Sequence, residues 1–526
     1  MPCLTRRALL ATAAATPLAA PRIARAAPTT LRFVPQANLT TLDPIFTTAT
    51  VTINHGYYVF DTLYATDSQS RPRPQMADGH EVSGNGLTWR IHLRDGLRFH
   101  DGTPVRAADC AASLARWAKR DPFGQVLNRA VEQWGAPDDR TFEIKLTRPF
   151  PLLLDAIGKP DANPAFVMPE RLARTDATAA LTEMVGSGPY RFLPGEYVSG
   201  SRNAYARFDG YNPRTEAPDW ASGGKVAHFD RVEWQVIPDS ATAASALQRG
   251  EVDWWEQPLP DLLPSLAGQG ITTQVDQPAG RLAIMRMNTL QPPFDNVKVR
   301  RAVLMAVNQD DYMHAVAGDD PSLSGGCRSL YPCGTPYASE TLGSTLIKGD
   351  IRAAKALLDQ SGYAGQRVVV INPTDFPTIG PLGQVTADML RKLGMNVDLQ
   401  EMDWGSVVQR RTSREPVDKG GWSIFHTFGS APAYANPAVS ALVRGQGAAG
   451  WYGWWSSPHA EELVGEWLAA TDPAAQARLA RQIGDLALEE VATVPLGRFF
   501  VKTAFRSSIT GVLQGTSPFP WNVRPA

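Results

Sequence analysis

The order of helical and extended segments in the second half of the chain constrains its fold more than any other feature. Asp350 opens a segment whose apolar residues recur at helical spacing, and Gly362 ends it. A second such segment covers residues 384–393 and ends at Gly394, and the strand Val397–Met402 follows directly. A helix, a glycine that stops it and a strand, in this order, predict an α/β fold with mixed sheets.

Length and net charge narrow the class of protein. A chain of 526 residues is too long for one hydrophobic core, and at about 150 residues per domain it favours about three domains. Residues 1–26 contain four arginines and no acid, so the rest of the chain has 47 basic and 52 acidic residues and a net charge of −5. This mild acidity gives no reason to expect nucleic acid or an anionic membrane surface as a partner.

The first residues are typical of an export signal. Two arginines at positions 6 and 7 precede an apolar run over residues 8–20, and residues 24–26 read Ala-Arg-Ala. We therefore expect cleavage after Ala26 and a periplasmic location. The run has 13 residues, fewer than the roughly 20 that span a membrane. The paired arginines favour the twin-arginine route. The general secretory route and a disordered basic tail are the alternatives.

The cysteines agree with an oxidising compartment. Cys327 and Cys333 are separated by five residues, a spacing that can close a small loop as a disulfide after export. A metal-binding pair is the other interpretation, although no histidine or third cysteine lies nearby in the sequence. Cys110 falls inside a segment predicted to be helical, residues 107–119, and we expect it to be a packed thiol.

Several stretches, in a fixed order along the chain, are similar to one known family. The longest reads Trp-Arg-Ile-His-Leu-Arg-Asp-Gly-Leu-Arg-Phe-His-Asp-Gly-Thr-Pro over residues 89–104. The others are Leu42-Asp43-Pro44 and residues 186–192, 249–253, 288–302, 353–363 and 494–496. Together they resemble the landmarks of the family-5 bacterial extracellular solute-binding proteins, which include the dipeptide-, oligopeptide- and nickel-binding proteins of ABC importers. The resemblance covers nearly the whole chain after residue 26.

The resemblance implies a fold and a mode of action. The fold is the large, three-domain form of the type II periplasmic-binding-protein fold, with two α/β lobes around a ligand cleft. Domain I would gather residues 27–75, 189–285 and 505–526, domain II residues 76–188, and domain III residues 286–504. Such a protein encloses its ligand by hinge closure and delivers it to the transmembrane subunits of an ABC permease. We expect it to act as a monomer.

The resemblance also implies residues of the ligand site. Trp404 and Trp422 correspond to tryptophans that flank the ligand in oligopeptide-binding relatives, and Thr48 and Thr50 match an early loop whose backbone can bond an extended ligand. Core packing of the tryptophans and a plain surface loop are the alternatives. The aromatic segment 451–455 is expected to be either a ligand wall or a clamp of domain III. The candidate ligand-binding residues are Thr48, Thr50, Trp404, Trp422, Phe425, His426 and Tyr452.

One departure from the family bears on the ligand. Peptide-binding relatives keep an aspartate three residues after the second tryptophan, where it pairs with the ligand's ammonium group, and this chain has Phe425 there. A buried ammonium without a counter-charge costs several kcal/mol. Unless an acid from elsewhere substitutes, we expect weak binding of unmodified di- and tripeptides. The ligand would then be neutral, anionic or capped, with Arg410 or Arg411 available to an acidic group as the alternative to the surface location that we expect for these two arginines.

Catalytic motifs are absent from the sequence. It has no Gly-x-Ser-x-Gly elbow, no His-Glu-x-x-His and no nucleotide fingerprint, and the eight histidines are scattered. His100 beside Asp101 is interpreted as part of a turn, because neighbouring residues of a strand point to opposite faces. We expect no enzyme activity, no catalytic residue, no cofactor and no metal site. A binder of metal chelates through His426, an exported hydrolase and a chaperone-like or sensory protein remain alternatives.

Overall fold

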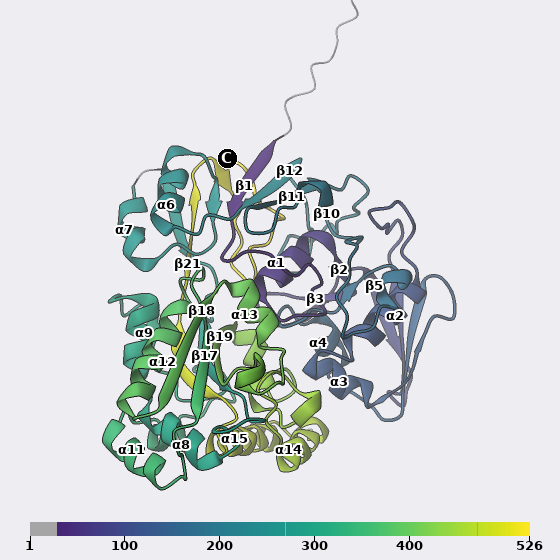
Figure 1. Ribbon diagram of the computed structural model, residues 1–526. Coiled ribbons are helices and arrows are strands. Elements are labelled where there is room, and N and C mark those ends of the chain that lie inside the picture. The colour runs from purple at the N-terminus through teal and green to yellow at the C-terminus, as the bar shows by residue number, and fades with distance from the viewer. Residues whose placement is uncertain (1–28, 269, 471) are drawn as a thin grey trace, which may run out of the picture.

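The computed structural model describes residues 29–526 apart from 269 and 471, and its three largest sheets lie in separate regions of the molecule. In Figure 1 the first sheet, with β1, β12 and β21, lies at the top, and the third, with β17, β18 and β19, lies below it. The second sheet and helix α2 lie to the right. The expected export signal, with its cleavage site after Ala26, falls outside the described residues.

The first sheet contains strands from near both ends of the described chain. Its strand order is β10-β11-β12-β1-β13-β21-β14, and β1 pairs in parallel with both of its neighbours while the other pairs are antiparallel. The strands are β1 (Thr30–Val34), β10 (Tyr190–Phe192), β11 (Arg202–Arg207), β12 (Arg231–Gln235), β13 (Trp254–Trp255), β14 (Ile271–Val275) and β21 (Lys502–Arg506).

Helices cover both faces of the first sheet. Neighbouring residues of a strand point to opposite faces, and Phe33 and Val34 of β1 accordingly belong to two different buried clusters. Helix α1 (Thr50–Val59) lies on the Phe33 side, where the ring of Tyr58 is 4.6 Å from that of Tyr205. Helix α6 (Ser240–Arg249) buries alanines and a leucine in the cluster of Val34.

The second sheet is built from one continuous stretch of chain and is antiparallel throughout, in the order β5-β6-β8-β7. Its strands are β5 (Ala77–Val82), β6 (Thr88–Leu93), β7 (Val131–Gly135) and β8 (Thr141–Leu146). The helices of this region are α2 (Ala107–Trp117), α3 (Pro122–Asn128), α4 (Leu153–Gly158) and α5 (Glu170–Ala173). The turn after α4 and the end of α2 matter below, because both reach the candidate site.

The third sheet has the order β16-β20-β15-β19-β17-β18, with β17 parallel to both β18 and β19. Its strands are β15 (Arg281–Met287), β16 (Ser324–Gly325), β17 (Arg367–Pro373), β18 (Asn396–Met402), β19 (Ile424–Ser430) and β20 (Val494–Phe499). The helices around it are α8 (Val297–Ala306), α9 (Gln309–Ala317), α10 (Gly343–Leu346), α11 (Ile351–Asp359), α12 (Gly380–Lys392), α13 (Trp404–Arg410), α14 (Pro458–Ala469) and α15 (Pro473–Glu489).

Short elements complete the described chain. They are the strand pairs β2 (Asp61–Thr62) with β9 (Phe166–Val167), β3 (Tyr64–Thr66) with β4 (Pro72–Pro74) and β22 (Ile509–Thr510) with β23 (Arg524–Pro525), and helix α7 (Leu263–Leu266). The 3₁₀ helices cover Pro194–Glu196, Pro260–Leu262, Val417–Lys419, Ala431–Tyr434, Ala441–Val443 and Gly447–Ala449. Within residues 29–526, leaving out 269 and 471, no helix has the length and apolar character needed to cross a membrane.

The mixed α/β fold predicted from the sequence is confirmed. The Asp350 side chain caps α11 by accepting the backbone N–H of Ala353, and Gly362 beyond the helix end has a φ of +86°. Gly394 likewise has a φ of +88° after α12, so each predicted helix stop uses the left-handed backbone that glycine tolerates. The second helix is longer than expected and begins at Gly380. The three-domain boundaries stay a prediction.

Candidate ligand-binding site

A cavity of about 290 Å³ lies between two parts of the chain that are far apart in sequence. One side is formed by residues 46–50, the segment after α2 and the turn 161–163 after α4. The other side is formed by residues 411–414 after α13, the end of β19 and several residues of the stretch 433–454. Small-molecule sites commonly have volumes of about 300–1,000 Å³, so this cavity suits a small solute.

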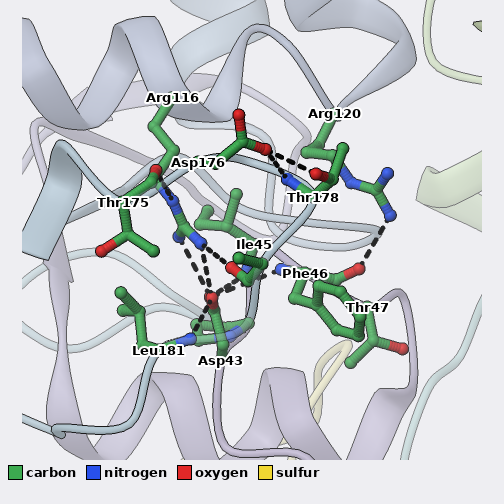
Figure 2. A network of polar contacts seen from close by, with 12 residues as sticks. Asp43, Ile45, Phe46, Thr47, Arg116, Arg120, Thr175, Asp176, Thr178 and Leu181 are labelled. Carbon is green, nitrogen blue, oxygen red and sulfur yellow. Dashed lines mark hydrogen bonds and ion pairs between the residues drawn. The ribbon is translucent and has the colours of Figure 1, made fainter.

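An ion pair fixes the loop that carries Thr48 and Thr50 to the cavity. The Asp43 carboxylate pairs with Arg116 of α2 at 2.7 Å, and both side chains are almost fully buried. Figure 2 shows that the same carboxylate also accepts the backbone N–H groups of Ile45 and Leu181, at 2.9 and 3.0 Å. The Leu-Asp-Pro motif thus ties this loop to the second sheet's helices and holds its conformation.

A second arginine supports the same loop. Arg120, which lines the cavity just after α2, donates to the backbone oxygen of Phe46 at 2.9 Å (Figure 2). Phe46, Thr48 and Thr50 all line the cavity, so the structure brings both predicted threonines to the candidate site.

Arg411 is the most unusual group on the cavity wall. Its residue is 1% exposed, its Nε has no hydrogen-bond partner, and Nη2 is 3.5 Å from the Thr48 hydroxyl. No carboxylate within residues 29–526, leaving out 269 and 471, forms an ion pair with it. A surface location is therefore wrong for Arg411. A guanidinium does not deprotonate in proteins, so this charge needs a partner that the described chain does not supply.

Aromatic rings surround the Arg411 guanidinium. Its carbon is 4.9 Å from the ring centre of Tyr452 and 5.6 Å from those of Trp404 and Phe425. Burial lowers the pKa of Arg411, while the hydroxyls of Tyr452 and Tyr434 act in the opposite direction. The rings stabilise the cation and orient it but cannot neutralise it.

The predicted tryptophans and Phe425 lie one layer behind the cavity. Trp404 is 3% exposed, Trp422 and Phe425 are fully buried, and none of the three is among the lining residues. The Trp422 ring packs 5.1 Å from that of Phe425, and its indole N–H donates to the backbone oxygen of Ser413 at 3.1 Å. In this structure they support Arg411 and the cavity wall, and their direct contact with a ligand stays a prediction.

His426 is buried on β19 and does not line the cavity. Its Nε2 is 2.7 Å from the hydroxyl of Thr386, which is in turn 2.9 Å from that of Tyr312. Burial lowers the pKa of His426 to about 3, so the ring is neutral at physiological pH. In the part of the chain that the structure describes, no group of three or more His, Cys, Asp or Glu side chains is arranged to hold a metal ion.

The aromatic segment 451–455 forms part of the cavity wall and also packs inside the third region. Trp451, Tyr452 and Trp454 line the cavity. Trp455 instead donates its indole N–H to Glu490 at 2.9 Å, away from the cavity. The buried Arg286 donates from Nε to the backbone oxygen of Tyr452 at 2.8 Å. The segment thus lines the cavity and packs inside the third region, and its contact with a ligand stays a prediction.

Two further lining residues have no signal in the sequence. Asp161 is the single acid among the described residues that line the cavity, and Tyr434 lines it too. Asp161 lies in a turn rich in proline and asparagine, a composition that marks a loop but not a site. Only the packing of the second region against residues 411–454 brings it to the cavity.

Contacts between the two sides close the cavity. Gln446 donates to Gln125 of α3 at 2.8 Å, and Arg444 donates to the backbone oxygen of Pro122 at 3.3 Å. The hydroxyl of Ser430, at the end of β19, donates to the Asp161 carboxylate. The structure thus has the two sides in contact around an interior space.

The cysteines lie away from this cavity. Cys327 and Cys333 are joined by a disulfide with an S–S distance of 2.06 Å. Cys110 is a free, buried thiol of α2, and burial raises its pKa well above the usual value.

Comparisons with known proteins give consistent matches. The pattern of the bacterial extracellular solute-binding proteins, family 5, middle region, matches residues 71–446. A probable peptide ABC transporter periplasmic-binding protein of Sinorhizobium fredii is 37% identical over 492 residues, which are 93% of this chain and 92% of that protein.

Solved structures share the fold. The periplasmic binding protein AgaA of A. tumefaciens R10, in complex with agropinic acid, has a TM-score of 0.79 at 21% identity, over 94% of this chain and 99% of that one. The dipeptide-binding protein of Pseudoalteromonas sp. SM9913, in complex with Met-Leu, has a TM-score of 0.77 at 19% identity, over 94% and 100% of the two chains.

Proposed function

Because this chain belongs to family 5 of the bacterial extracellular solute-binding proteins, we propose that its cavity captures a small organic solute that carries a carboxylate. The protein is a substrate-binding component of an ABC importer, and its relatives are transport proteins of the periplasm. Hinge closure encloses the solute, and the closed protein delivers it to the transmembrane subunits of a permease. The protein acts as a monomer and performs no chemistry on its ligand.

Arg411 is the observation that supports a carboxylate. It is a buried cation on the cavity wall without an ion-pair partner in the described chain. Leaving such a charge unpaired in a closed cleft costs several kcal/mol, whereas a carboxylate matches the planar donors of a guanidinium. Cations outnumber acids among the described lining residues, since Lys119, Arg120 and Arg414 also line the cavity beside the one acid, Asp161.

The ligands named for two structural neighbours fall in the same chemical class. One is an organic acid, agropinic acid, and the other is a dipeptide, Met-Leu. The Sinorhizobium relative carries the name of a probable peptide transporter component. A small organic acid, such as a short peptide with a free carboxylate, is the ligand class that agrees with these names and with Arg411.

Export of the protein would explain the sequence pattern of the first residues. We infer that residues 1–26 are a signal that directs twin-arginine export and is cut after Ala26. This inference rests on the sequence of the signal and on the periplasmic location of the family.

Substituting Arg411 tests the proposed function. The probes are small dipeptides and N-acyl amino acids, each prepared as the free acid and as the primary amide, with binding measured by calorimetry. We expect the native protein to bind at least one free acid about tenfold or more tightly than its amide, and Arg411→Gln to lose this preference, because the amide side chain carries no charge.

A matched control separates charge at the site from charge elsewhere. Arg391 is exposed on α12 and lines no part of the cavity. Arg391→Gln removes the same charge and should keep the preference for the acid. If no free acid binds more tightly than its amide in the native protein, the proposed role of Arg411 is wrong.

A further inference from the structure

Asp161 gives the cavity a second, oppositely charged pole. It lies in the turn after α4, on the side of the cavity opposite to the segment 411–414, and its side chain is half-buried but reached from the cavity. Its two carboxylate oxygens accept hydrogen bonds from Ser430 and from the backbone N–H of Ala162. Each oxygen keeps further acceptor capacity, because an ionised carboxylate has about four acceptor sites.

The two basic groups whose charge lowers the pKa of Asp161 are already paired. Lys159 forms an ion pair with the buried Asp121, and Arg281 forms one with Asp276 through two hydrogen bonds, at 2.7 and 2.6 Å. No ion pair with Asp161 occurs among the residues that the structure describes. Burial accordingly raises the pKa of Asp161, and only the hydrogen bonds and these more distant cations oppose the change.

Tyr434 lies within electrostatic range of both poles. Burial raises the pKa of Tyr434, the Asp161 carboxylate raises it further, and the guanidinium groups of Arg286 and Arg411 act in the opposite direction. Tyr434 itself lines the cavity. A ligand in this space therefore meets a carboxylate from the second region and a guanidinium from the third, with a tyrosine near both.

From this arrangement we propose that Asp161 binds a cationic group of the ligand, so that the solute is a small zwitterion held between Asp161 and Arg411. The proposal rests on the proposed function and narrows its ligand class. Position 425, where the family resemblance predicts an acid, holds a phenylalanine. In this proposal Asp161, on the opposite side of the cavity, supplies the counter-charge for the ligand's ammonium instead.

The proposal couples recognition of the cation to closure. Ser430 belongs to β19 of the third sheet, whereas Asp161 belongs to the second region, and their hydrogen bond joins the two sides of the cavity. A cation bound at Asp161 is thus enclosed only when the two sides meet, and the closed form gains an interaction that an open form lacks.

The test compares each free dipeptide with its N-acetyl form. Ala-Ala and Met-Leu are used as zwitterions, as N-acetyl acids and as C-terminal amides, with binding measured by calorimetry. We expect acetylation to weaken binding to the native protein by about tenfold or more, the equivalent of about 1.4 kcal/mol. Asp161→Asn should bind the free and acetylated acids within about threefold of each other and keep the preference for acids over amides.

Controls make the outcome specific. Asp155 is exposed on α4 and does not line the cavity, so Asp155→Asn should behave as the native protein does. Ser430→Ala removes the hydrogen bond to Asp161 but keeps the charge of Asp161, and it should preserve the preference for the free ammonium. Thermal unfolding of each variant checks that it is folded.

The two proposals fail in different ways. If neither dipeptide binds the native protein more tightly than its N-acetyl form, or if folded Asp161→Asn keeps the full preference, the role of Asp161 is overturned. If Asp161→Asn does not fold, the comparison of free and N-acetylated dipeptides in the native protein still tests the role of Asp161. If the native protein instead binds the free acids no more tightly than the amides, the role of Arg411 is overturned.

Discussion

At the scale of single residues, the contact between Phe425 and Arg411 bears on whether the Arg411 charge is available to a ligand. The family resemblance predicts an aspartate at the position of Phe425, and this chain places a ring there that packs 5.6 Å from the guanidinium carbon of Arg411. An acid at this position would neutralise Arg411 from within the protein. Because Phe425 carries no charge, the guanidinium of Arg411 stays available to a carboxylate of the ligand.

Phe425→Asp tests this interpretation. We expect the new carboxylate to pair with Arg411 and to weaken binding of carboxylate ligands by about tenfold or more, because an internal counter-ion competes with the ligand. Loss of the buried ring also destabilises the fold by about 3–5 kcal/mol, which thermal unfolding would report.

Phe425→Asn is the matched control, since it creates a space of the same size without the charge. It should lose stability as Phe425→Asp does but keep binding carboxylates several-fold more tightly than Phe425→Asp. Equal affinities of the two variants for carboxylate ligands would contradict an ion pair between position 425 and Arg411.

At the scale of elements, Glu256 connects three parts of the first region. It follows β13, and its carboxylate accepts the backbone N–H of Gln36, which follows β1, at 2.7 Å, and the side-chain amide of Asn54 in α1 at 2.9 Å. Burial raises its pKa to about 7, and the Asp276 carboxylate adds to this, against the opposing effects of its hydrogen bonds and of Arg281.

The raised pKa of Glu256 predicts how stability changes with pH. Between about pH 4.5 and pH 7 the folded chain keeps a proton on Glu256 that the unfolded chain has lost. Its contribution to the free energy of unfolding is therefore fully present below pH 4.5 and is lost as the pH rises through about 7, a change of about 3 kcal/mol.

Glu256→Gln should remove this dependence. Its amide does not titrate, so we expect a smaller fall in stability between about pH 4.5 and pH 8 than in the native protein. Urea unfolding at the two pH values measures both falls. If the falls are equal, Glu256 does not titrate in this range.

Sequence signals predicted the elements better than the site. The cap at Asp350 and the stops at Gly362 and Gly394 act within one turn of their own helix, so local sequence contains them. The resemblance pointed to Thr48 and Thr50, and both line the cavity because the Leu-Asp-Pro motif fixes their loop through Arg116 of a neighbouring helix.

Tertiary packing decides the rest of the site. Arg411 lies on the cavity because α13 ends there, and it is buried because the rings of Trp404, Phe425 and Tyr452 surround it. Asp161 comes from a short turn more than 200 residues earlier, and no periodicity or motif in the sequence relates such a turn to a distant cavity.

At the scale of the whole molecule, the cavity exists because the second and third regions meet. The contacts Gln446–Gln125, Arg444–Pro122 and Ser430–Asp161 all join the two sides directly around it. Opening of a hinge between these regions would separate Asp161 from the side that carries Arg411. The structure therefore has the geometry of a closed binding protein, in which the two charged poles act on one ligand only after closure.

Native mass spectrometry of the protein purified from the periplasm of its own host tests the central claim most directly. The measurement compares the mass of the intact complex for the native protein and for Arg411→Gln, and then identifies the released solute. We predict that the native protein retains a small solute with a carboxylate and that Arg411→Gln loses it. A retained solute without a carboxylate, or equal retention by both proteins, would contradict the account.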